Sequence, residues 1–172
     1  MNNAYGYRFL LAQLHFDSLK DKKSPKAIRT ALKDLSTGND AYDDAYNDAM
    51  ERIEGQLDGD EKLAKQVLSW ITCASRPLTT VELAHALAVE LGELEFDKEN
   101  LSPIEDIVSV CAGLVTVDEE SAIIRLVHYT TQEYFERTQK SWFPDAENDI
   151  TKICLTYISF KDFEIGICQD DE

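Results

Sequence analysis

The feature that most constrains the fold is a helix-start signal that occurs three times in the second half of the sequence. Each copy places Ser or Thr three residues before Glu, at Thr79–Glu82, Ser102–Glu105 and Thr130–Glu133. In such a capping box the hydroxyl and the carboxylate satisfy backbone amides that the first helical turn leaves without partners. Pro103 suits the first helical position, and Tyr129 and Tyr134 flank the third box as a hydrophobic staple. The sequence therefore predicts helices over 80–91 and 103–111, and a further helix that starts at Thr130.

A β-hairpin is predicted between the second and third of these helices. Apolar stretches at 114–117 and 123–127 flank the polar turn 118–121, and Gly113 ends the helix before them. Apolar residues at helical spacing over 63–74, followed by Pro77, predict another helix upstream. Three helices followed by a hairpin is the winged-helix order, with 103–111 in the recognition position and 114–127 as the wing.

Helical periodicity also covers both ends of the chain. Apolar faces over 7–19, 25–35 and 40–57 predict three N-terminal helices, and a last helix is expected around 150–158. We expect a mainly α fold: a helical linker domain at 1–58, a winged-helix domain with a small β-hairpin at 59–140, and a C-terminal helix with an acidic end at 141–172. The acidic side of 40–57 is interpreted as a solvated helix face. A calcium loop that starts at Asp40 would need glycine where Ala45 stands.

Charge argues against two classes of partner. The chain has 17 basic and 33 acidic residues, and the span 76–128 has three basic and eleven acidic residues. The predicted recognition helix offers Glu105 and Asp106 and no Arg or Lys, so we expect no nucleic-acid partner. The apolar run 107–117 is too short to span a bilayer, and no signal peptide is visible, so a cytoplasmic protein without a membrane partner is expected. Accordingly, the four cysteines, at 73, 111, 154 and 168, are interpreted as reduced core thiols.

No catalytic or metal motif is present. A P-loop, a G-x-S-x-G elbow and an H-E-x-x-H zinc motif are all absent from the sequence, so we assign no catalytic residue and no metal ligand. His15 and His85 fall on predicted helices and are expected to be half-buried structural residues. His128 differs because it closes the second wing strand and directly precedes a helix start, where amides favour an anion. Spacing alone still favours a structural role for His128.

The stretch Leu126-Val127-His128-Tyr129-Thr130-Thr131-Gln132-Glu133-Tyr134-Phe135 resembles the end of the winged-helix domain in NACHT-type STAND NTPases. These are signalling ATPases of the NOD-like receptor class, and the likeness is to their fungal relatives with ankyrin repeats. Weaker similarity covers about residues 5–160, including Leu68-x-Trp70-Ile71 and Pro77-Leu78-Thr79-x-x-Glu82-Leu83. The resemblance implies a helical and winged-helix region that packs on the NTPase core. It also implies that His128 contacts the phosphates of bound ADP and helps to hold an inactive state.

Two hypotheses follow. In the first, the chain is a non-catalytic regulatory module whose His128 reports on a nucleotide held by the NTPase core. ATP or ADP is then a cofactor of the parent protein, none is bound by the chain alone, and the partners are the NACHT domain and downstream ankyrin repeats. In the second, the chain is a protein-interaction adaptor with an acidic winged helix and no nucleotide role. Some relatives of this winged helix carry a lipid-deacylase label, which no serine nucleophile motif here supports.

Overall fold

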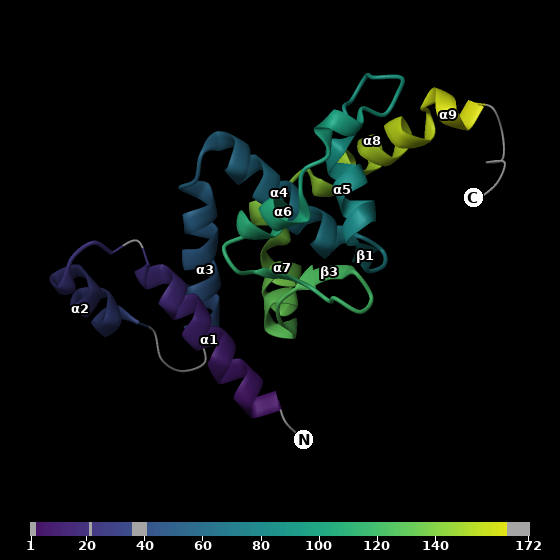
Figure 1. Ribbon diagram of the computed structural model, residues 1–172. Coiled ribbons are helices and arrows are strands. Elements are labelled where there is room, and N and C mark those ends of the chain that lie inside the picture. The colour runs from purple at the N-terminus through teal and green to yellow at the C-terminus, as the bar shows by residue number, and fades with distance from the viewer. Residues whose placement is uncertain (1–2, 21, 36–40, 165–172) are drawn as a thin grey trace.

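The computed structural model describes residues 3–20, 22–35 and 41–164, and it is mainly helical (Figure 1). Three helices come first: α1 (Asn3–Leu19), α2 (Pro25–Asp34) and α3 (Ala41–Glu54). α2 starts as its sequence predicts, because the Ser24 hydroxyl accepts from the amide of Ala27 and proline occupies the first turn. α1 packs across α3, whereas α2 lies at the periphery of the molecule.

The winged helix follows in the predicted order. It consists of α4 (Asp58–Cys73), β1 (Leu78–Thr79), α5 (Thr80–Ala88), the short 3-10 turn η1 (Lys98–Asn100), α6 (Ile104–Ser109), β2 (Val115–Val117) and β3 (Ile123–Leu126). α7 (Tyr129–Trp142), α8 (Ala146–Ile158) and α9 (Lys161–Glu164) complete the described part. The mainly α fold with a small sheet is confirmed. No helix of the described residues combines the length and apolar character needed to cross a bilayer.

The sheet has one strand more than the sequence predicts. β2 and β3 form the expected antiparallel hairpin, with Thr116 opposite Arg125, and β1 adds to the other edge of β3 with Leu78 opposite Ile124. β1 is two residues long, too short to show the alternation by which a strand is recognised. β1 is a strand only because it pairs with β3, so it can be identified only once the tertiary fold is known.

One of the three predicted capping boxes is formed. At α5 the Thr79 hydroxyl accepts from the amide of Glu82, and the Glu82 carboxylate accepts from the amide of Thr79. The box predicted at Ser102 is wrong, because α6 starts one residue later, with Pro103 in the cap position and no side-chain cap. The box at Thr130 is also wrong, since α7 begins at Tyr129 and His128 is its cap.

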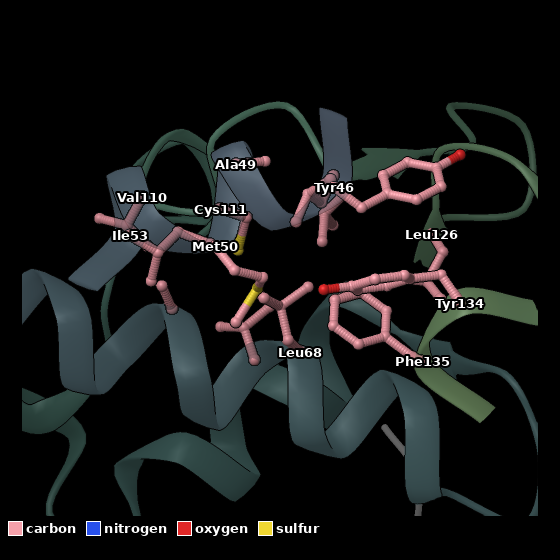
Figure 2. Packing of buried hydrophobic residues seen from close by; sticks show 14 of the residues in the cluster. Tyr46, Ala49, Met50, Ile53, Leu68, Val110, Cys111, Leu126, Tyr134 and Phe135 are labelled. Atoms are coloured by element: carbon pink, nitrogen blue, oxygen red, sulfur yellow. The ribbon is translucent and has the colours of Figure 1, made fainter. Parts of the chain in front are cut away.

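The core joins the helical extension to the winged helix. α4 lies at the centre, in contact with α3, α5, α6, α7, α8 and β3. Figure 2 shows Met50 of α3 pointing toward Leu68 of α4, with Ile53 of α3 on one side and Phe135 of α7 on the other. These four side chains are fully buried or nearly so. Buried residues of α1, α3 and the winged helix thus belong to one apolar cluster.

The prediction that the cysteines are core thiols is correct for only some of them. Cys111 is fully buried in the core, and burial raises the pKa of its thiol to about 12. Cys73 is half-buried and donates to Gln139. Cys154 is exposed on α8, so the prediction of a core thiol is wrong for this residue. Cys168 lies outside the described residues.

Candidate functional site at the junction of the wing and α7

His128 lies between the last wing strand and the next helix. β3 ends at Leu126, and the amide of Val127 still bonds to the carbonyl of Leu114 across the hairpin. His128 is therefore held in an extended conformation, with φ −154° and ψ 157°, while its carbonyl accepts from the amides of Thr131 and Gln132 at the start of α7. This backbone arrangement is the one that an N-cap residue requires.

The imidazole of His128 serves as the cap. Its Nδ1 accepts from the amide of Thr130 at 3.3 Å and lies 2.9 Å from the hydroxyl of the same residue. Because Nδ1 accepts a hydrogen bond, the neutral ring carries its proton on Nε2. The ring of Tyr129, the first residue of α7, packs against it at a tilt of 36°, with centroids 4.5 Å apart. Tyr129 is thus not in the position before the cap that the predicted staple with Tyr134 requires.

The side chain of His128 is half-buried, so it is neither fully solvated nor sealed in the core. Desolvation lowers the pKa of the imidazole below its ordinary value, and the nearby carboxylate of Glu133 opposes this effect. At neutral pH the residue is therefore a neutral imidazole. Such a ring binds an anion as an N–H donor and not as a cation.

A chain of hydroxyl groups connects this junction to the helical extension. The Tyr46 hydroxyl of α3 lies 2.6 Å from Oγ1 of Thr130, and Oγ1 of Thr131 donates to the same Tyr46 oxygen at 3.2 Å. Tyr46 and Thr131 are fully buried. Burial raises the pKa of Tyr46, which keeps its hydroxyl protonated. His128 is therefore linked through Thr130 to a residue 82 positions earlier in the chain.

Further polar contacts extend along the same interface between α3 and α7. The Tyr134 hydroxyl donates to Asn47 at 2.6 Å and accepts from the indole of Trp142 at 2.9 Å. At the exposed edge, Arg137 forms two hydrogen bonds to Asp43, at 2.8 and 3.0 Å. The sequence predicts a solvated acidic face for 40–57, whereas Asp43 and Asn47 on that face bond to residues of α7. These partners can be identified only when the positions of α3 and α7 relative to each other are known.

The other two histidines do not join this site. His85 is half-buried on α5, where its Nδ1 lies 2.8 Å from the carbonyl of Val81 and its ring stacks on Phe96. His15 is half-buried on α1, and burial lowers its pKa against the effect of Asp48. Their predicted placement as half-buried helix residues is confirmed. Among the described residues, no three His, Cys, Asp or Glu side chains gather in a way that could hold a metal ion.

A second candidate surface lies between α5 and α8. A cleft of about 450 Å³ there is lined largely by apolar side chains, including Trp70, Val89, Ile153 and Tyr157. At its edges Val81 and Ile158 are each 62% exposed. Large apolar side chains gathered at one exposed place are typical of protein contact surfaces.

The acidic surface of the winged helix is also visible in three dimensions. Glu105 and Asp106 are exposed in the first turn of α6, and Glu119 and Glu120 are exposed at the wing tip. Two of the three basic residues of the span 76–128 are paired, Arg76 with Glu82 and Arg125 with Asp118. The absence of a nucleic-acid partner stays a prediction, which this distribution of charge supports.

The order of helices and strands from α4 to β3 defines the class of protein: a winged-helix domain preceded by a helical extension. The family model described as GPI inositol-deacylase, winged helix domain, matches residues 50–143, from within α3 to the end of α7. That is more than half of the chain, and the chain belongs to this family. No curated protein and no solved structure is found to be similar to it.

Proposed function

We propose that this chain is a non-catalytic regulatory module of a STAND ATPase of the NACHT type, and that His128 senses ADP bound to the NTPase core. The family establishes a winged-helix domain. The H-x-T-x-Q-E-Y element at 128–134 supports the link to NACHT proteins by resemblance. In this proposal, residues 1–58 connect the core to a winged helix at 59–140, and 141–172 lead toward ankyrin repeats.

The observation that carries the proposal is the bonding of His128. Nδ1 is engaged with the first turn of α7, and the half-buried ring keeps its proton on Nε2. An Nε2–H donor beside the N-terminus of a 14-residue helix suits a phosphate oxygen, because the helix dipole and the anionic acceptor both strengthen the bond. Such a bond exists only when a neighbouring domain presents the phosphate. ADP would therefore favour the packed conformation over the released one.

Substitution by asparagine separates sensing from capping. Asparagine is a good N-cap residue, so His128→Asn keeps the start of α7 but removes the imidazole donor. In the complete parent protein, we expect this variant to release ADP about tenfold faster, as loss of one hydrogen bond to a charged group implies. His85→Asn is the matched control, because His85 is also half-buried and bonded through Nδ1 but lies on α5. It should leave the ADP release rate unchanged.

Two results would contradict the proposal. One is an unchanged ADP release rate in His128→Asn, measured with a fluorescent ADP analogue in stopped flow. The other is a tight complex of ATP or ADP with the isolated chain, measured by calorimetry, because the proposal places the nucleotide site on the NTPase core. We also propose that the chain itself has no enzymatic activity, which the same preparations test as ATP turnover.

The cleft between α5 and α8 favours a second candidate function, that of an interaction adaptor. In this reading the exposed Val81 and Ile158 pack against the ankyrin repeats of the parent protein, and His128 only caps α7. Val81→Asp combined with Ile158→Asp should then abolish binding of separately expressed ankyrin repeats in calorimetry. His128→Asn should affect neither that binding nor the retention of ADP. Under the regulatory proposal, His128→Asn changes ADP retention whatever the double variant does.

A further inference from the structure

Three hydroxyl groups lead to the ring of His128, and hydrogen-bonding rules fix the direction in which each donates. Nδ1 accepts from the amide of Thr130, so it carries no proton, and the Thr130 hydroxyl at 2.9 Å has to be a donor to it. A hydroxyl has a single proton, so Thr130 must accept at the 2.6 Å contact with Tyr46. Tyr46 donates there and accepts from Thr131. The protons of these three hydroxyl groups thus all point along the series of hydrogen bonds toward Nδ1 of His128.

Protonation of Nδ1 would conflict with this arrangement. The amide of Thr130 would then face an N–H group and lose its acceptor. The Thr130 hydroxyl would have to offer the ring one lone pair while Tyr46 already occupies the other, and its own proton would lose Nδ1 as its acceptor. Tyr46 is fully buried, and no water can replace Thr130 without opening the packing of α3 on α7. The buried tyrosine therefore opposes the charged form of His128 through the Thr130 hydroxyl that both residues contact.

We infer that Tyr46 is a positioning residue for His128: acting through the hydroxyl of Thr130, it keeps the imidazole neutral, with its proton on Nε2. The helical extension thereby determines the state of a ring at the start of α7. A displacement of α3 relative to α7 that breaks the Tyr46–Thr130 bond releases the Thr130 hydroxyl and lets His128 take up a proton. The consequence for nucleotide sensing rests on the function proposed above, but the effect on protonation does not.

Glu133, on α7, is a charged group that acts on this ring: it raises the pKa of His128, while desolvation lowers it. On the elements that meet at the junction, Arg137 lies on α7, Asp43 on α3 and Arg125 on β3. None of these groups is changed by the substitutions below.

The test uses the isolated chain and compares substitutions of two tyrosines that lie in similar surroundings but have different hydrogen-bond partners. Tyr46 and Tyr134 are both buried at the interface of α3 and α7, and each has two hydrogen-bond partners there. In a nitrogen-15 NMR titration of the imidazole, the unchanged chain should show the Nε2–H tautomer and a pKa below 6.5. Tyr46→Phe should raise this pKa toward 6.5, with at least a threefold gain in proton affinity. Tyr134→Phe should leave it unchanged.

Thr130→Val provides a second variant, because it removes the hydroxyl donor and keeps the amide that bonds to Nδ1. It should raise the pKa of His128 in the same direction as Tyr46→Phe. The inference is overturned if Tyr46→Phe leaves the pKa of His128 in place, whatever Thr130→Val does. It is also overturned if Tyr134→Phe raises the pKa equally, since general loosening of the interface would then explain the shift. An unchanged ADP release rate in His128→Asn would instead refute the sensing role and leave this result standing.

Discussion

At the start of α7, the amide of Thr130 has the imidazole of His128 as its acceptor. An unsatisfied cap typically costs about 1 kcal/mol, so His128→Ala should lower the free energy of unfolding of the isolated chain by about that amount. His128→Asn should restore most of the loss, because its side-chain oxygen can accept from the same turn. Urea unfolding followed by circular dichroism measures both variants. If Asn proves as destabilising as Ala, the ring contributes through packing and not as a cap.

The lowered pKa of His128 also makes stability depend on pH. The folded protein binds this proton less tightly than the unfolded chain, whose imidazole titrates near 6.5. The stabilising contribution is therefore complete above pH 6.5 and is lost as the pH falls from 6.5 through the lower folded value. Because a net charge of −16 adds its own pH dependence, the variable to follow is the difference between the unchanged chain and His128→Asn. From pH 7.5 to pH 5.5, the free energy of unfolding of the unchanged chain should fall relative to that of His128→Asn. A constant difference would contradict the direction of the shift.

The start of helix α5 contains a carboxyl group, that of Glu82, whose pKa is strongly lowered. The pKa of Glu82 falls to about 2, first because of the hydrogen bond from Arg76 and then because of the amide of Thr79. Arg76→Ala should raise this pKa toward 4.5 but leave it below that value, since the capping box remains. Carboxyl carbon NMR measures the shift. Arg137→Ala removes an equally exposed arginine that pairs with Asp43, so it should not move the pKa of Glu82.

The helix starts also show what could be predicted from sequence. A pattern of Thr followed by Glu three residues later identifies α5 correctly, but it misplaces the cap of α7. There β3 continues so close to the helix that His128 still has the extended conformation of a cap, and the hydroxyl of Thr130 turns to His128 and Tyr46. Element order and periodicity could be read from the sequence because they are local. The third strand and the partner of Thr130 could not, because the strand depends on residues 44 and 46 positions away and Thr130 on a residue 84 positions away.

Over the whole molecule, one apolar cluster joins the helical extension to the winged helix, so the two should unfold together. Cys111 is a natural probe of this event. Its thiol is buried and its pKa is about 12, so it should react with a thiol reagent only when the core opens. Exposed Cys154 should react at once. With Cys73 and Cys168 both replaced by serine, two well-separated phases of reaction are expected, one from Cys154 and one from Cys111.

A core variant outside the winged helix then tests whether the opening is global. Met50 of α3 is fully buried, and Met50→Ala should cost about 2–5 kcal/mol, which makes the slow reaction of Cys111 about 30-fold faster or more when reclosing outpaces labelling. Leu155→Ala, at a position 56% exposed on α8, should leave that rate nearly unchanged. An unchanged Cys111 rate in Met50→Ala would mean that Cys111 is exposed while Met50 keeps its contacts, so the helical extension and the winged helix would not unfold as one unit.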